Sequence, residues 1–219
     1  MSPAAGPARP KRRDAAANAD RLVQAAREVF AQRGLSATLE DIAQHAGVGV
    51  GTVYRNFASK REIVARLYDD TLRDVMAEVR PALQIDDPWL ALVTFFEIAA
   101  THQAQDRGLC ETLLGQNDLG GPAGIHPEAA TALLAELTPL FDRARGAGVL
   151  RDGVTATDVG PIFMMLEPLY RLGAGRSELW RRYLAVVLDG LRAEGRRALP
   201  VAGLDAEGFA AVVSGEGAP

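Results

Sequence analysis

The sequence predicts an all-α fold. Apolar residues recur at spacings of three and four along most of the chain, which is the repeat of one helix face. Ser, Thr or Pro stands where several of these runs begin, and Gly stands where several end. No stretch alternates apolar and polar residues as a half-buried strand does. We therefore expect about nine helices and no sheet.

The first part of the chain predicts three short elements and a leading arm. Residues 1–13 are rich in Pro, Ala and Gly and end in three basic residues, which is typical of a flexible basic arm. Residues 14–33 carry a helical pattern that Gly34 should stop. Thr38, with Asp41 three residues later, predicts the capped start of a second helix that Gly47 ends. A third short helix is expected over residues 50–56.

The rest of the chain predicts longer helices. Ser59 and Glu62 match a capping box, which should open a helix that runs to about Arg80, where Pro81 discourages continuation. Further helices are expected from Pro88, interrupted by Gly108 before a shorter piece near 109–116, then over 127–145, from Thr155 to about 172 with a kink at Pro168, and over 178–193 opened by Ser177. The expected parts are a basic arm (1–13), a unit of three helices (14–60), a helical domain (61–199) and a loose tail (200–219), in which residues 209–213 could dock.

Composition narrows the class of protein. With 48% hydrophobic residues, a chain of 219 residues can bury a core. The net charge is −4, yet residues 1–62 hold 10 Lys and Arg against 6 Asp and Glu, so only this basic part is expected to meet a polyanion. Cys110 is the single cysteine, so no intrachain disulfide is possible. No membrane span or signal peptide is recognisable, and we expect a cytoplasmic protein.

Three glycines at alternate positions, Gly47, Gly49 and Gly51, raise the question of a phosphate-binding loop. A dinucleotide-binding loop needs G-x-G-x-x-G between a strand and a helix, whereas here the third glycine comes one residue early and a helix precedes the loop. The spacing fits a helix–turn–helix instead. Gly47 would form the left-handed turn, Val48 would fill the angle between the helices, and Gly49 and Gly51 would let the next helix approach a DNA backbone closely.

Several segments together resemble the DNA-binding signature of the TetR family of transcriptional regulators. They are Thr38-Leu-Glu-Asp-Ile-Ala43, Ala46-Gly-Val48, Gly51-Thr-Val-Tyr54, Phe57 and Ser59-Lys-Arg-Glu62, and the resemblance covers about residues 15–65. It implies a phosphate contact for Thr38, backbone or base contacts for Thr52 and Tyr54, and a phosphate contact for Lys60. The family often has polar residues at the positions of Gly49 and Val50.

This departure leaves Thr52, Arg55 and Asn56 as the main candidates for reading sequence. An arginine can hold guanine by two hydrogen bonds, worth about 1–3 kcal/mol of discrimination. The predicted DNA-contacting residues are Arg12, Arg13, Thr38, Gly49, Val50, Gly51, Thr52, Tyr54, Arg55, Asn56 and Lys60. The alternatives stay open that Tyr54 and Phe57 are core aromatics, that Arg55 is a solvated surface residue and that the arm is a solvated tail.

For the remaining part, the resemblance implies a helical domain that binds a ligand and forms a dimer, whose last two long helices build a four-helix bundle with a second subunit. The candidate dimer contacts are Leu166, Leu169, Tyr170, Tyr183, Val187 and Leu191. The candidate ligand contacts are Trp89, Phe96, His102, Phe141, Met164 and Met165. Methionine near aromatic rings suits a hydrophobic effector. Each residue of both sets could instead be ordinary core.

An enzyme is the competing class. The three histidines have no metal-ligand spacing, and nothing orients His102 towards Cys110, so no catalytic residue, metal or cofactor is expected. A third class is a DNA-binding structural protein without a ligand, against which the long apolar helical half argues. The sequence therefore predicts a regulator, most often a repressor in this family, that binds double-stranded palindromic DNA as a homodimer and is released by a small molecule.

Overall fold

All the helices expected within the described part of the chain are present. The computed structural model describes residues 10–105, 127–170, 178–194, 199–205, 207 and 208. These residues form no β-strand, only an isolated bridge between Leu150 and Arg192, so the all-α prediction is confirmed for them. The α-helices are α1 (Pro10–Arg33), α2 (Leu39–Ala46), α3 (Val50–Asn56), α4 (Lys60–Leu83), α5 (Pro88–Gln105), α8 (Pro127–Gly146), α9 (Val159–Tyr170) and α10 (Leu179–Leu191). Two 3₁₀ turns, η1 (Gly34–Ser36) and η2 (Ala156–Asp158), complete the set.

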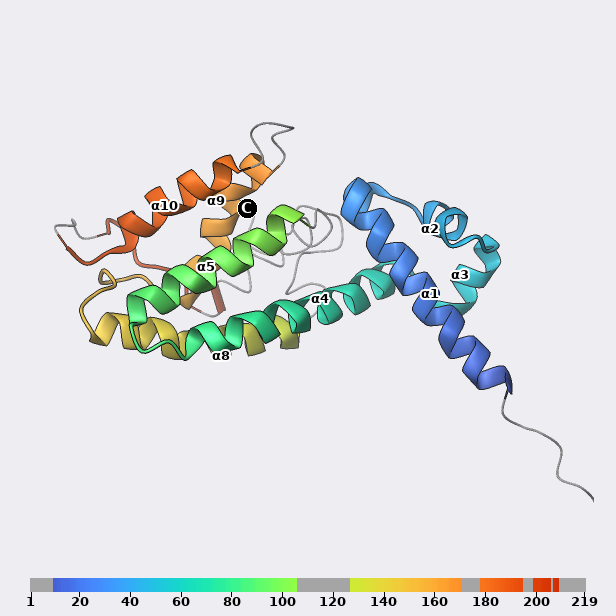
Figure 1. The fold of residues 1–219 in the computed structure, drawn as a ribbon, viewed down its shortest axis with the longest axis horizontal. Coiled ribbons are helices and arrows are strands. Elements are labelled where there is room, and N and C mark those ends of the chain that lie inside the picture. Colours follow the sequence, from blue (N-terminus) through green and yellow to red (C-terminus); the bar gives the residue numbers. More distant parts are fainter. Residues whose placement is uncertain (1–9, 106–126, 171–177, 195–198, 206, 209–219) are drawn as a thin grey trace, which may run out of the picture.

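The molecule has two lobes joined by the long helix α4 (Figure 1). Each lobe has its own hydrophobic core. Helices α1, α2 and α3 build the smaller core together with Ile63, Val64 and Leu67 from the start of α4. Helices α5, α8, α9 and α10 build the larger core with the later part of α4, from Val75 onward. Because one continuous helix contributes to both cores, α4 is the mechanical connection between the lobes.

Local sequence signals explain most helix ends. Gly34, the residue that follows the end of α1, has φ +68°, and the next residue, Leu35, is buried. Gly47 has φ +67° at the end of α2, a conformation that a Cβ makes costly. The Asp87 carboxylate accepts hydrogen bonds from the backbone amides of Trp89 and Leu90, and it thereby caps the start of α5.

Three predictions about helix ends need correction. The first helix starts at Pro10 and not at residue 14, so residues 10–13 are helical, as a proline at the first helical position allows. Helix α4 continues through Pro81 to Leu83, so the proline, which removes one intrahelical hydrogen bond, does not end the helix at Arg80. The Ser59 hydroxyl accepts the Glu62 amide, but the Glu62 carboxylate accepts from the amide of Ala58, so the capping box is incomplete.

Part of the predicted loose tail is packed against the larger lobe. The Thr157 hydroxyl in η2 donates to the Leu204 carbonyl at 2.7 Å. A Cβ added to Gly203 would lie 3.4 Å from the Gly153 carbonyl oxygen, so the tail also approaches the turn before η2. The predictions for residues 109–116, Ser177 and residues 209–213 lie outside the described residues. Within the described part, no helix combines the length and apolar character needed to cross a membrane.

Candidate nucleic-acid interface

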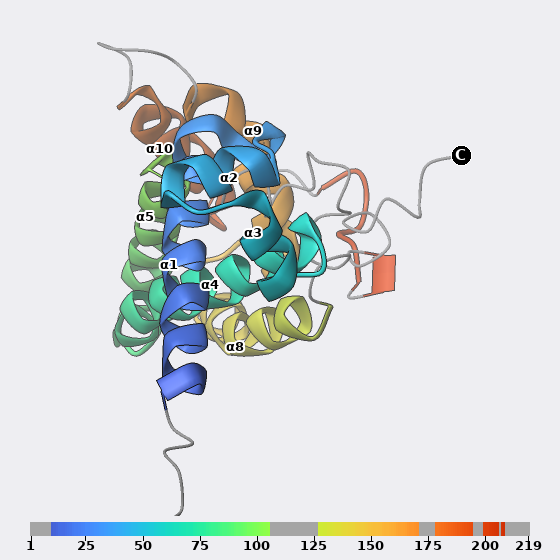
Figure 2. The same cartoon turned by 90° about the vertical axis from the view of Figure 1, so that its right-hand side faces the viewer.

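Helices α2 and α3 form a helix–turn–helix whose inner face is fixed by the smaller core. Ile42 of α2 and Val53 of α3 are fully buried, and Phe57, directly after α3, is 6% exposed. Val48 in the turn packs against the same core, as expected. Phe57 is therefore a core residue. Figure 2 shows α2 and α3 at the end of the molecule that faces away from the larger lobe.

Several of the predicted DNA-contacting residues lie on the outer face of α3. Gly51, Tyr54 and Arg55 are exposed, and Val50, Thr52 and Asn56 are partly exposed. Residues three and four apart share one side of a helix, so Gly51, Tyr54 and Arg55 present a common surface. Tyr54 is 54% exposed, which shows that it is not a core aromatic.

Two polar side chains of α3 are tied to the helix itself. Arg55 donates from Nε to the Gly51 carbonyl and from Nη2 to the Thr52 hydroxyl, both at 3.1 Å. Asn56 donates from Nδ2 to the Thr52 carbonyl at 2.7 Å. Arg55 thus lies on the exposed surface in a defined position, and Asn56 stabilises the end of α3.

The two other glycines differ from Gly47. Gly49 is the N-cap residue of α3 with φ −71°, which any residue adopts. A Cβ added to Gly49 or Gly51 would meet no atom within 4 Å. The fold of this chain therefore requires glycine at position 47 but not at 49 or 51.

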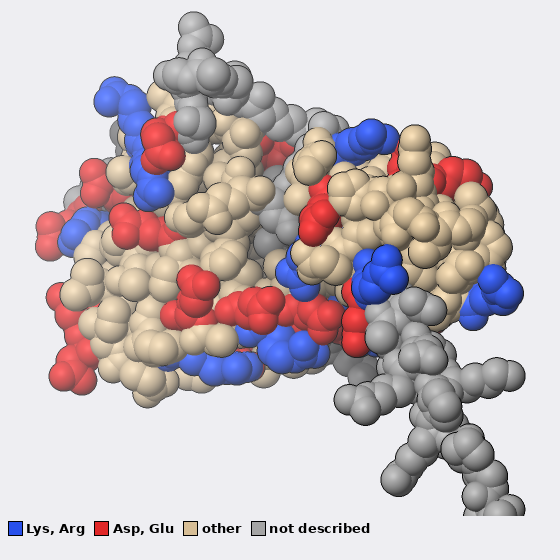
Figure 3. Space-filling model, turned by 45° about the vertical axis from the view of Figure 1, so that its right-hand side comes forward, with Lys and Arg blue, Asp and Glu red and all other residues tan. Residues whose placement is uncertain are grey.

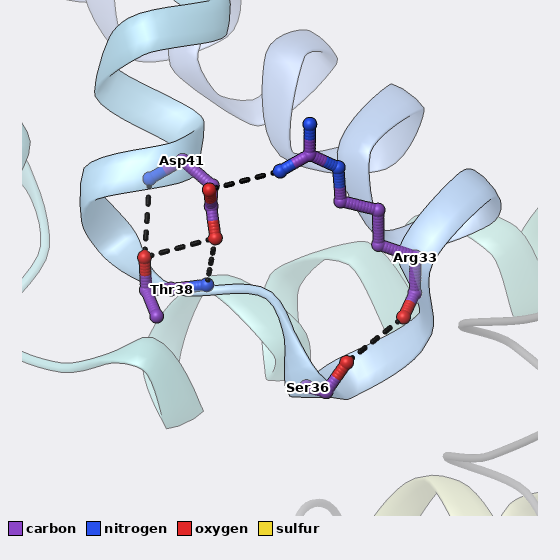
Figure 4. A network of polar contacts seen from close by, with 4 residues as sticks. All are labelled: Arg33, Ser36, Thr38 and Asp41. Atoms are coloured by element: carbon purple, nitrogen blue, oxygen red, sulfur yellow. Dashed lines mark hydrogen bonds and ion pairs between the residues drawn. The ribbon is translucent and has the colours of Figure 1, made fainter.

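The start of α2 is held by a polar network around Asp41 (Figure 4). The Asp41 carboxylate accepts from the Thr38 amide at 2.8 Å, the Thr38 hydroxyl at 3.0 Å and Arg33 Nη1 at 2.9 Å. These hydrogen bonds, that of the Thr38 amide first, hold the pKa of the Asp41 carboxyl below its ordinary value. The Asp41 amide in turn donates to the Thr38 hydroxyl, which completes the predicted capping box. A hydroxyl has a single proton, so a phosphate contact through it would replace the bond from Thr38 to Asp41.

Lys60 is partly buried at the junction of α4 with the turn after α1. Its ammonium donates to the Leu35 carbonyl and lies 5.8 Å from the centre of the Phe30 ring. Lys60 therefore ties α4 to the smaller lobe, and its predicted phosphate contact stays a prediction. Arg12 and Arg13 lie in the first turn of α1 and not in a flexible arm, because the helix starts before them.

Figure 3 shows charges of both signs on each lobe. Lys and Arg side chains lie among Asp and Glu on the smaller lobe, and a row of Asp and Glu crosses the larger lobe beside a row of Lys and Arg. The expectation that only the N-terminal part meets a polyanion stays a prediction.

The six predicted ligand contacts do not form one pocket. Phe96 and Phe141 are fully buried together, with ring centres 6.5 Å apart, and fill the core of the larger lobe. His102 lies between α5 and α4, with Nε2 3.1 Å from the Glu78 carboxylate. Met164 and Met165 are 43% and 61% exposed, so neither lines the interior of this subunit. They project from α9 on the side opposite to its core-facing residues, which the apolar sequence of this helix could not reveal.

Trp89 lines a surface groove of about 200 Å³ between α5 and α10. Both tryptophans of the chain line this groove, and an arginine guanidinium lies over each ring. The guanidinium carbon of Arg192 is 4.3 Å from the centre of the Trp89 ring, and that of Arg181 is 4.4 Å from the centre of the Trp180 ring. Three charged residues also line the groove, Glu97, Arg181 and Asp189, and its remaining wall is aliphatic.

The predicted dimer contacts divide into three groups by exposure. Leu166 is 1% exposed and belongs to the core of the larger lobe, so it is not available to a second subunit. Tyr183 is 45% exposed. The other four are partly buried against the core: Leu169, Tyr170, Val187 and Leu191. Sequence reasoning missed Val186, which is 60% exposed on the same side of α10 as Tyr183.

Comparison with known proteins gives matches over most of the chain. Residues 22–67 match the family model of bacterial regulatory proteins of the tetR family, and residues 87–193 match the model of the SbtR-like transcriptional regulator C-terminal domain. The chain is 35% identical to the regulator SrpR of Pseudomonas putida over 97 residues, which is 44% of this chain and 45% of SrpR. The match thus spans less than half the length of that relative.

Two further matches extend over both lobes. The repressor KstR2 of Rhodococcus jostii is 29% identical over 190 residues, which cover 78% of this chain and 89% of KstR2. The crystal structure of a TetR regulatory protein from Mycobacterium vanbaalenii is 32% identical, covers 84% of this chain and 99% of that chain, and superposes with a TM-score of 0.52.

Proposed function

We propose, starting from the fact that this chain belongs to the TetR family of bacterial transcriptional regulators, that it is a homodimeric repressor of a palindromic DNA operator, released by a small molecule. Membership makes the chain a DNA-binding regulator and not an enzyme. The dimer, the symmetry of the operator and the response to an effector are our inferences. The repressor assignment is supported by the similarity to KstR2, which is described as a repressor.

The exposed face of α3 is the observation that carries the DNA-binding surface. A recognition helix must present side chains and a close backbone to the major groove. Tyr54 and Arg55 supply side chains on this face, and the two glycines without a structural need, Gly49 and Gly51, supply a backbone that no Cβ shields. At the start of α2, Thr38 and the first amides of the helix face a neighbouring phosphate.

The dimer is supported by exposed apolar side chains on α9 and α10. Glu167 is the only charged residue of α9 and is 5% exposed, so the exposed side of this helix is apolar. Met164 and Met165 on α9, and Tyr183 and Val186 on the adjacent α10, are large apolar side chains left in contact with solvent in the single subunit. A surface of this kind marks an interface. Two-fold symmetry of the dimer would match a palindromic operator.

The effector response is supported by the contacts of α4 with both lobes. Arg27 of α1 donates to the Thr71 hydroxyl at 3.4 Å. Towards the other end of α4, Arg80 donates to both carboxylate oxygens of Glu136 on α8 at 2.9 Å. A shift of the larger lobe would therefore move α4 and, through it, the orientation of α3. A small molecule releases DNA only if it binds better to the form with misplaced recognition helices.

The groove between α5 and α10 is our candidate for the effector site. Its two tryptophans and aliphatic residues suit a small, largely apolar molecule, while Glu97 and Arg181 can fix its orientation. Since Trp89 and Trp180 are the only tryptophans of the chain, the intrinsic fluorescence of the protein would report binding there directly.

Gel-shift titration of the full chain tests the proposal. The DNA would be fragments upstream of the protein's own gene and its neighbours, with salt varied from low to moderate. We expect one fragment to bind far more tightly than random DNA, with affinity that falls steeply as salt rises. Binding to every fragment no better than to random DNA would refute the regulator assignment. A screen of small hydrophobic molecules for quenching of tryptophan fluorescence and release of the fragment then tests the effector.

A further inference from the structure

The side chain of Arg55 uses one edge of its guanidinium within α3. Nε–H and one N–H of Nη2 are parallel and form this edge, and they donate to the Gly51 carbonyl and the Thr52 hydroxyl. Both acceptors lie in the turn of α3 that precedes Arg55. The guanidinium is thereby folded along the exposed face of the recognition helix and does not extend freely into solvent.

The second edge of the same guanidinium takes no part in these two hydrogen bonds, and Arg55 is exposed. It consists of the parallel N–H bonds of Nη1 and Nη2. Such a pair is what O6 and N7 of guanine accept in the major groove, where Arg is the most common partner of this base. The two intrahelical hydrogen bonds therefore leave Arg55 with the edge that recognises guanine.

Thr52 contributes to this arrangement through an acceptor and not through a contact of its own with a base. Its hydroxyl oxygen accepts from Arg55, and its carbonyl accepts from Asn56. An arginine that is already held in place loses less rotamer freedom when it binds. For a flexible side chain this freedom corresponds to a factor of about 2 to 10 in affinity.

We propose that Thr52 is a positioning residue that, together with the Gly51 carbonyl, holds Arg55 in place to read a guanine in each half-site of the operator. The proposal rests on the proposed function, because it requires α3 to enter the major groove. It assigns to Thr52 a part in specificity that acts through Arg55.

Five variants of the full chain separate this role from alternatives. Thr52→Val keeps the shape of the side chain and removes the acceptor, and Thr52→Ser keeps the acceptor. Arg55→Lys keeps the charge and removes the planar fork. The last two variants are Arg55→Ala alone and Arg55→Ala combined with Thr52→Val. Each is tested against the bound fragment and against duplexes in which every base pair of the half-site is replaced in turn, at one fixed salt concentration, with thermal melting as a check on folding.

For the wild-type protein, replacement of one G·C pair in each half-site should lower the affinity by about 5- to 150-fold, which is the range of a bidentate arginine contact. Arg55→Lys should lose most of this preference at that pair only. Thr52→Val should weaken the preference at the same pair by about 2- to 10-fold, whereas Thr52→Ser retains it. In the absence of Arg55, Thr52→Val should cause no further change in base preference.

Other outcomes overturn the inference. If Thr52→Val changes preference at a different base pair, or still changes it without Arg55, Thr52 reads DNA by itself. If Thr52→Val melts like the wild type and keeps the full preference, the hydrogen bond to Arg55 has no role in recognition. If the wild type prefers no fragment over random DNA, the proposed function itself fails, which is a separate result.

Discussion

Gly51→Ala is expected to stabilise the fold and to weaken binding to DNA. Gly51 is the second residue of α3, and a Cβ at this position meets no atom within 4 Å. Alanine is favoured over glycine by about 0.8–1.0 kcal/mol inside a helix, and by somewhat less in a first turn, so we expect a gain of about 0.5–1 kcal/mol. For a chain of this size, that gain raises the melting temperature by about 1–4 °C.

The same methyl group would stand on the face that α3 presents with Tyr54 and Arg55. A methyl group forced into a close contact costs about 1–3 kcal/mol, so the affinity for the bound fragment should fall by about 5- to 150-fold. Thermal melting measures the first effect, and gel-shift titration of the folded variant at fixed salt measures the second. We therefore expect the melting temperature to rise while the affinity for DNA falls. A variant that was only destabilised would show both a lower melting temperature and a lower affinity.

Gly47→Ala is the matched control. Gly47 has φ +67°, so the same added methyl group should destabilise the protein by about 1–2 kcal/mol and lower the melting temperature. If Gly51→Ala bound DNA as tightly as the wild type, the reasoning that its backbone approaches DNA would be wrong. A lower melting temperature for Gly51→Ala would contradict the reasoning on helix stability.

Three further predictions concern the larger lobe. Phe141→Ala should cost about 3–5 kcal/mol in urea unfolding followed by circular dichroism, because the ring is 1% exposed; a loss under about 1 kcal/mol would show that the core does not depend on it. The hydrogen bond from Arg80 holds the pKa of the Glu136 carboxyl below its ordinary value of 4.5, so this pair stabilises the fold above about pH 4.5 and ceases to do so as the pH falls through the lowered pKa. Glu136→Gln should therefore melt slightly earlier than the wild type at pH 7, with a difference that shrinks as the pH falls below 4.5, and a gap that widened in acid would contradict this linkage. Met165→Glu should convert a dimer to a monomer in sedimentation experiments, whereas Leu90→Glu, at an equally exposed position on α5, should leave it intact; a dimeric Met165→Glu would exclude α9 from the interface.

The sequence alone predicted most of the smaller lobe because the signals there are local. The Thr38 and Asp41 pair, the left-handed Gly47 and the short α3 depend on residues within four positions of each other. Helix starts at Pro88 and Pro127 follow from the same short-range rules. The family signature lies in this region too, so the DNA-binding part of the function was accessible from sequence.

The tertiary structure alone decided which side chains are turned inward. Apart from Glu167, helix α9 carries no charged residue, so its sequence did not show that Leu166 is in the core while Met165 next to it faces solvent. Lys60 could have been directed at a phosphate, and only the position of Leu35, 25 residues earlier, showed its contact within the chain. The tail docks through Thr157, 47 residues before Leu204. Each of these outcomes depends on elements distant in sequence, whose packing no local pattern encodes.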